Sequence, residues 1–173
     1  FEFGPDGTFL REIGQNLYGF GFAHTVRIDK NDNIWATDEG TNMIIKFSPA
    51  GKVLMVLGRR AEAVEAPAPE PRPGEQPRPQ WGGFNRPTDV AVAQSGDIYV
   101  SDGYGNCRVH RFAADGTLIQ SWGEPGKSAP GHFHLPHGVW AHSDGRILVA
   151  DRENNRIQVF RKPTVAIIAT GDE

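Results

Sequence analysis

Short runs of apolar residues recur along the chain, and turn residues separate them. In the middle of the chain these runs are "VAVA", "DIYVSD", "RVHRF" and "TLIQSWG", between residues 90 and 123. Runs of this length, rich in β-branched and aromatic residues, predict strands. The intervening "QSGD" and "AADG" are typical of tight turns between antiparallel neighbours. The pattern therefore predicts a unit of four antiparallel strands.

Two further copies of this unit are visible in the chain. The predicted units cover residues 20–58, 84–123 and 133–173, and residues 1–14 match only the last two strands of a unit. His24, Thr88 and His137 occupy equivalent positions in the three units. Four-stranded units with a period of about 40 residues indicate the blades of a β-propeller. We therefore expect an all-β fold, a single propeller domain with about three and a half antiparallel blades.

An arc of this size is shorter than a closed ring of roughly four to eight blades. Because an open arc leaves unpaired sheet edges, we expect further blades from a longer protein, or else from a second chain. The longer protein is the favoured alternative. Between the first two complete units, residues 61–83 are rich in Pro and Glu, which predicts an extended loop insertion.

Composition narrows the function classes. The 173 residues are 38% hydrophobic and 23% charged, with a formal net charge of −3, as in ordinary globular proteins. The chain lacks the basic footprint of a nucleic-acid partner and the run of about 18 apolar residues that a membrane helix needs. We therefore expect neither nucleic acid nor membrane as a partner. The single cysteine, Cys107, excludes an internal disulfide. Composition assigns the protein to no particular cellular compartment.

Four side chains are expected to meet at one face of the propeller. The first strand of a blade lines the central channel, and its start lies beside the end of the antiparallel second strand. His24 and His137 begin first strands, while Tyr104 and Arg152 follow the aspartate that ends a second strand. The second unit has Thr88 in place of histidine, so the fold does not require an imidazole there.

Each of these residues also has a structural interpretation. The histidines are either hydrogen-bonded structural residues or, since they converge from different blades, ligands of a zinc ion. Tyr104 could plug a loop, and Arg152 could pair with a neighbouring acid. Counting from the shared aspartate, the counterparts of Tyr104 are Gly40 and Glu153.

Residues shared by the units, or lying away from this face, are expected to be structural. Asp38, Asp102 and Asp151 are predicted to accept backbone N–H bonds in turns. The other histidines are expected at the surface, with His134 a further candidate for the metal; they are His110, His132, His134 and His142.

The stretches "RPTDVAV", "VSDGYGNCRV" and "PHGV" followed by "VADRENNRIQVF" resemble the NHL-repeat propeller of peptidyl-α-hydroxyglycine α-amidating lyase. The resemblance implies six blades and a catalytic zinc held near the channel by three histidines. Two of these match His24 and His137, and the third would lie in blades outside this chain. It also implies a structural calcium that uses a backbone position matching Val26.

The same resemblance assigns Tyr104 as the catalytic tyrosine and Arg152 as an active-site arginine. It implies release of glyoxylate from a small peptide that ends in α-hydroxyglycine, or an equivalent reaction on another small hydroxylated molecule, in a secreted or periplasmic protein. With two zinc ligands the chain alone is expected to be inactive. In the family a cysteine directly follows the tyrosine, where this chain has Gly105. The alternative is a non-catalytic NHL propeller that binds a protein or another ligand across one face.

Overall fold

The computed structural model describes residues 1–60 and 83–161, which are almost entirely strands. The N-terminal hairpin pairs β1 (Glu2–Phe3) with β2 (Phe9–Arg11). The next sheet contains β3 (Ala23–Ile28), β4 (Ile34–Asp38), β5 (Met43–Phe47) and β6 (Val53–Gly58). A second sheet contains β7 (Asp89–Val92), β8 (Ile98–Asp102), β9 (Arg108–Phe112) and β10 (Leu118–Trp122). The last described sheet contains β13 (Pro136–Ala141), β14 (Arg146–Asp151) and β15 (Arg156–Arg161), with the 3-10 turn η1 (Arg152–Asn154) before β15.

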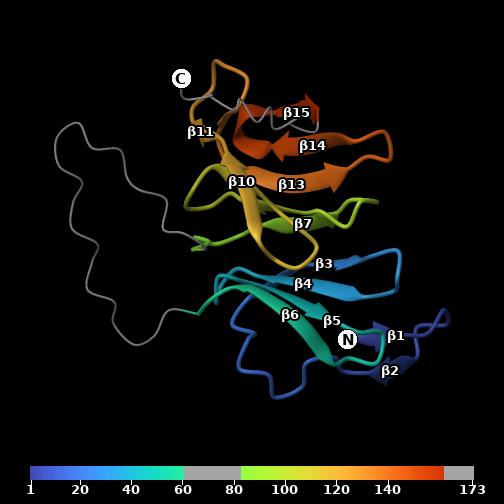
Figure 1. Cartoon of the computed structure of the whole chain (residues 1–173). Coiled ribbons are helices and arrows are strands. Elements are labelled where there is room, and N and C mark those ends of the chain that lie inside the picture. Colours follow the sequence, from blue (N-terminus) through green and yellow to red (C-terminus); the bar gives the residue numbers. More distant parts are fainter. Residues whose placement is uncertain (61–82, 162–173) are drawn as a thin grey trace, which may run out of the picture.

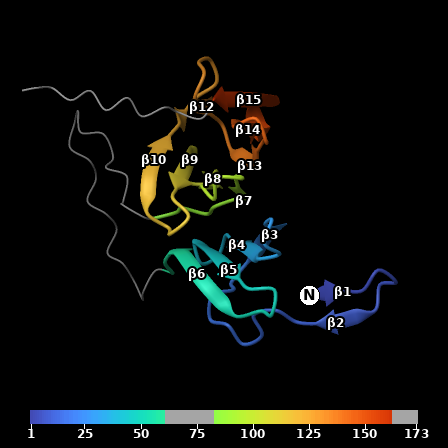
Figure 2. The same cartoon turned by 45° about the vertical axis from the view of Figure 1, so that its right-hand side comes forward.

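The sheets follow one another as the blades of a propeller, and each is a meander of antiparallel strands (Figure 1). Strand β7 contacts both β3 and β13, so the first strands of three successive blades lie side by side (Figures 1 and 2). The predicted all-β fold with four-stranded antiparallel blades is confirmed. A short parallel pair, β11 (Glu124–Pro125) and β12 (His132–Phe133), lies in the connection to the third blade.

Two predicted segments fall outside the described residues. These are the Pro-rich insertion, apart from its last residue, and the last strand of the third unit. In residues 1–60 and 83–161 the structure contains no helix with the length and apolarity of a membrane span.

The hydrophobic core lies between the blades. Trp35 and Ile44 of the first complete blade pack against Val90 and Val100 of the second. A separate cluster joins the second blade to the third, and it includes Tyr99, Val109, Phe133, Val139 and Val149. Every residue of β8 is buried, because neighbouring blades cover both faces of the sheet. Burial on both faces explains why Ile98, Tyr99 and Val100 are apolar in succession, without alternation.

Candidate functional site

His24 and His137 each lie in a β-bulge at the start of a first strand. The pairing of β3 with β4 shifts register between Ala23 and Thr25, and that of β13 with β14 shifts between Pro136 and Gly138. A bulge redirects the side chain of its extra residue. The two imidazole rings approach each other with centroids 5.1 Å apart, although they come from non-adjacent blades. The convergence predicted from the repeat register is therefore present.

A backbone carbonyl sets the tautomer of His24. Its Nδ1 lies 2.8 Å from the carbonyl oxygen of Thr88. Because a carbonyl oxygen only accepts, Nδ1 carries the proton and donates it, which leaves a lone pair on Nε2. Thr25 Oγ1 donates to the same carbonyl at 2.9 Å. The second blade therefore contributes its backbone at the position where its neighbours contribute imidazoles.

His137 lies beside the hydroxyl of Tyr104, with Nε2 3.4 Å from the phenolic oxygen. Burial lowers the pKa of His137, and the nearby charges of Arg152 and His24 lower it further. The neutral imidazole is therefore favoured at this position. A neutral imidazole is the form that binds a metal or accepts a proton.

The ring of Tyr104 lies against both imidazoles and forms a cluster with His24 and His137. Its centroid lies 6.0 Å from that of His24 and 5.9 Å from that of His137, with edge-to-face geometry in both pairs. Two guanidinium groups flank the ring, with Arg86 4.8 Å and Arg152 5.9 Å from its centroid. Two imidazoles, one phenol and two cations thus meet on one face of the arc.

Arg152 is exposed, and its Nε donates to Glu153 at 2.8 Å. The pKa of its guanidinium is raised, first by this bond to Glu153 and then by Tyr104. Arg152 therefore has the acidic neighbour expected from the sequence and also faces the tyrosine. The two interpretations of this residue are compatible.

The structure changes which residues are equivalent to Tyr104. The backbone N–H of Tyr104 donates to the carbonyl of Arg86, as those of Glu39 and Arg152 donate to Phe22 and Leu135. The counterparts of Tyr104 are thus Glu39 and Arg152, and the assignment to Gly40 and Glu153 was wrong by one residue. The extra residue of the second blade is Gly103, which is buried directly after Asp102.

Sequence reasoning missed Arg86 and Glu39. The Nε and Nη2 atoms of Arg86 both donate to Oε1 of Glu39, the Nε bond at 2.8 Å. The carboxylate is nearly buried, with 8% of its side chain exposed. The signal that could have identified Glu39 is its place directly after Asp38, since Arg152 follows Asp151 in the same way.

The aspartates shared by the blades are structural, as predicted. Asp38 accepts the N–H groups of Gly21, Phe22 and Thr41. Asp102 accepts that of Asn85, and Asp151 accepts that of His134. All three are fully buried. Each therefore anchors the segment that leads into the first strand of its own blade.

The expectation that His110 lies at the surface was wrong. Its exposed fraction is 8%, and it bridges Ser121 (2.7 Å to Oγ) and Asp102 (3.3 Å to Oδ2). This arrangement contains the residue types of a catalytic triad. However, the equivalent residue of the third blade is Gln158, whose amide donates to Asp151 at 3.0 Å. In these two blades the position therefore holds a polar bond to the blade aspartate, whereas the first complete blade has Ile45 there, and we interpret His110 as structural.

The described residues offer a metal two ligands of the expected kind. Across residues 1–60 and 83–161, no group of three or more His, Cys, Asp or Glu side chains could hold a metal ion. His134 is exposed and belongs to no such group. The donor set nevertheless fits part of a zinc site, because His24 uses Nδ1 on a carbonyl and keeps Nε2 free, as zinc-bound histidines do.

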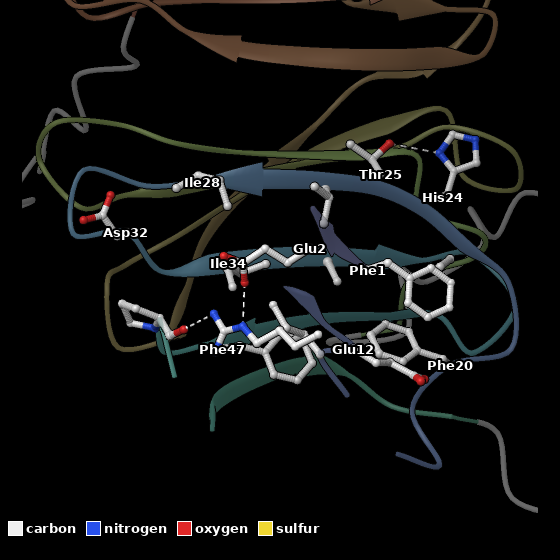
Figure 3. Close-up of a pocket in the computed structure, with 16 residues that line it drawn as sticks. Phe1, Glu2, Glu12, Phe20, His24, Thr25, Ile28, Asp32, Ile34 and Phe47 are labelled. Atoms are coloured by element: carbon white, nitrogen blue, oxygen red, sulfur yellow. Dashed lines mark hydrogen bonds and ion pairs between the residues drawn. The ribbon is translucent and has the colours of Figure 1, made fainter. Parts of the chain in front are cut away.

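A cavity of about 730 Å³ adjoins the cluster, between the N-terminal hairpin and the face of sheet β3–β6. Its lining is mainly apolar and includes Phe1, Phe20, Ile34 and Phe47, while His24 lies at one end beside Thr25 (Figure 3). Val26 also lines this cavity, with 59% of its surface exposed. The cavity thus lies over the outer face of the first complete blade, and the cluster is at its margin.

The blades and their sequence repeats define the class of protein. The NHL repeat family matches residues 84–112 and 133–160, which span the first three strands of the second and third blades. In fold, the chain is similar to the β-propeller domain of Cps50 (Swd1) from Myceliophteria thermophila. The TM-score is 0.52 and the identity 14%, over 83% of this chain and 41% of that one. The chain is therefore an arc of a β-propeller, and NHL repeats make up most of its second and third blades.

Sequence similarity is more specific. Peptidyl-glycine alpha-amidating monooxygenase B of Xenopus laevis is 38% identical over 90% of this chain and 17% of that protein. A probable peptidyl-alpha-hydroxyglycine alpha-amidating lyase of Caenorhabditis elegans is 37% identical over 87% and 39%. NHL repeat-containing protein 3 of Homo sapiens is 33% identical over 94% and 45%. The chain thus resembles amidating lyases over most of its length, and it spans less than half of each of these relatives.

Proposed function

We propose that the chain supplies part of the active site of a zinc-dependent carbon–nitrogen lyase of the amidating type. The reaction would convert a peptidyl-α-hydroxyglycine, or a similar small hydroxylated molecule, to an amide and glyoxylate. The observation that carries the proposal is the meeting of His24 and His137 with Tyr104 between two arginines. Proteins named as amidating lyases are 37% and 34% identical to this chain.

His24 and His137 would hold the zinc together with a third ligand from outside the described residues. Bound zinc supplies a Lewis acid, which lowers the pKa of a substrate hydroxyl. The neutral state of His137 and the fixed tautomer of His24 both suit ligation. The resemblance also motivates a structural calcium at the backbone of Val26.

Tyr104 is the proposed base. It takes the proton from the hydroxyl of the carbinol carbon, and the O–H electron pair becomes the second bond of the new aldehyde. The C–N bond breaks, and its electron pair and a proton go to the nitrogen of the product amide. A phenol needs nearby positive charge to act as a base at neutral pH, which the guanidinium of Arg152 would provide. Arg152, whose guanidinium is a fork of donors, would orient the substrate carboxylate.

Metal analysis and turnover of the intact protein test this proposal. The protein should retain zinc after dialysis and release glyoxylate from α-hydroxyhippurate. Tyr104→Phe should abolish release and leave the metal content unchanged, whereas His24→Ala and His137→Ala should lose zinc. A metal-free protein, or a Tyr104→Phe variant with normal turnover, would refute it. Calcium in the same metal analysis would support the second site.

The second candidate is a non-catalytic NHL propeller that binds a protein or another ligand across one face. The similarity to NHL repeat-containing protein 3 favours it, because that name states a repeat and no reaction. Under this alternative, His24→Ala and His137→Ala would leave ligand binding intact. The dialysis experiment therefore separates the two functions.

A further inference from the structure

Arg86 occupies a position at which the fold does not require a charged residue. Its counterparts in the first and third blades are Phe22 and Leu135, since the three carbonyls accept equivalent N–H bonds. Arg86 has φ 63° and Leu135 has φ 68°, so the left-handed backbone is shared with the third blade and does not depend on a guanidinium. The guanidinium must therefore be explained by what it contacts.

The contacts of Arg86 connect two blades to Tyr104. Its guanidinium pairs with the buried carboxylate of Glu39 in the first complete blade. It also lies over the ring of Tyr104, with its central carbon 4.8 Å from the ring centroid. The quadrupole of an aromatic ring attracts a cation that lies over its face. The pairing with Glu39 restrains the guanidinium, so the ring meets a cation held in one place.

The backbone around Arg86 is restrained as well. Its N–H donates to the side-chain oxygen of Asn42 at 2.7 Å. The N–H of Tyr104 approaches its carbonyl at 3.5 Å, and that of Gly105 donates to Asn85 at 3.0 Å. The segment before β7 and the loop after β8 thus lie against each other, and the tyrosine is held through both its backbone and its ring.

We propose that Arg86 is a positioning residue, which, restrained by Glu39, fixes the ring of Tyr104 against His137. The inference rests on the proposed function. The phenolic oxygen lies 3.4 Å from Nε2 of His137, and that arrangement depends on the rotation of the ring. Loss of Arg86 would release the ring without removing the hydroxyl, so the chemical step would slow and substrate binding would change little.

Arg86→Leu tests the proposal, because leucine is the residue at the equivalent position of the third blade. In the intact protein we expect kcat for glyoxylate release to fall about 10- to 100-fold, since a displacement of about 1 Å costs up to about 100-fold. KM should stay within about twofold, and zinc content should not change. Glu39→Gln should lower kcat by less, and the double variant should be no slower than Arg86→Leu alone, because Glu39 acts through Arg86.

Arg146→Leu is the matched control, because Arg146 forms an exposed ion pair with Asp144 in the turn before β14, at the opposite end of its blade. It should leave kcat unchanged. If Tyr104→Phe is inactive but Arg86→Leu keeps kcat within twofold, the positioning role alone is refuted. A raised KM with unchanged kcat would also refute it, since Arg86 would then bind substrate. If Tyr104→Phe is fully active, the proposed function itself fails.

Discussion

Gly103 is the extra residue of the second blade and lies in the loop between β8 and β9 (residues 103–107, the tyrosine loop). Substitution of Gly103 tests directly how this loop packs against β13. A β-carbon at this position would lie 2.2 Å from the carbonyl oxygen of Pro136 and 3.1 Å from Cγ2 of Thr88. Ordinary contacts begin at 3.4 Å. Because the oxygen belongs to the backbone directly before His137, no side-chain rotation can relieve the clash. Gly103→Ala must therefore separate the tyrosine loop from β13 by about 1 Å.

The expected cost follows from this separation. Overpacking of a buried site costs about 1–3 kcal/mol, and we expect the upper half of that range because the obstacle is backbone. The same displacement separates Tyr104 from His137, so turnover should fall about 100-fold. Gly103 does not have a left-handed φ, so the cost is steric alone.

Urea unfolding and glyoxylate release would measure the two effects. Gly138→Ala is the matched control, because a β-carbon there meets only Ala150 and Asp89 at 3.6 Å and 3.8 Å. The control should unfold within about 0.5 kcal/mol of the parent. If Gly103→Ala is as stable as Gly138→Ala, the tight packing of this loop against β13 is wrong.

Two further substitutions test the structural side chains of the blades. Asp151→Asn should lower the free energy of unfolding by about 3–5 kcal/mol, because it leaves Arg156 without its buried partner. Burial alone would raise the pKa of Asp151, but hydrogen bonds from Asn154, His134, Arg156 and Gln158 outweigh it and lower the pKa below 3.8. The stability from this carboxylate is thus present above pH 3.8 and is lost as the pH falls through the lower folded value; thermal melts from pH 7 to 3 should show a flatter dependence for the variant. His110→Gln, which copies Gln158, should cost no more than about 1.5 kcal/mol in urea unfolding and leave turnover intact. An inactive His110→Gln protein would contradict the structural role of this histidine.

Repeat spacing predicted the blades and the approach of His24 to His137, because equivalent residues of successive blades face the same channel. It could not predict the bulges that direct these side chains, since both result from pairing with the second strand. Counting from the aspartate also misplaced the extra residue. Only the backbone bonds show that the loop widens at Gly103, directly after Asp102.

The alternation of polar and apolar residues along a strand also failed to predict that His110 is buried. Neighbouring blades cover both faces of the second sheet, so His110 and Arg111 are both buried although successive residues of β9 point to opposite faces. Arg86 and Glu39 escaped notice because they pair across a blade boundary, 47 residues apart in sequence. Ion pairs between blades depend on how the blades pack, so the pattern of polar and apolar residues within a single blade does not predict them.

The aspartate that ends each second strand has a consequence for how such proteins diversify. Asp38, Asp102 and Asp151 are buried and hold the backbone of their blades, and the equivalent position that follows is Glu39, Tyr104 or Arg152. An acid, a phenol and a guanidinium are thus accommodated at one position of the repeat, which in the second blade follows an extra glycine. A change of side chain at this one position of each blade can therefore introduce new chemistry, while the buried aspartate before it keeps the blade folded.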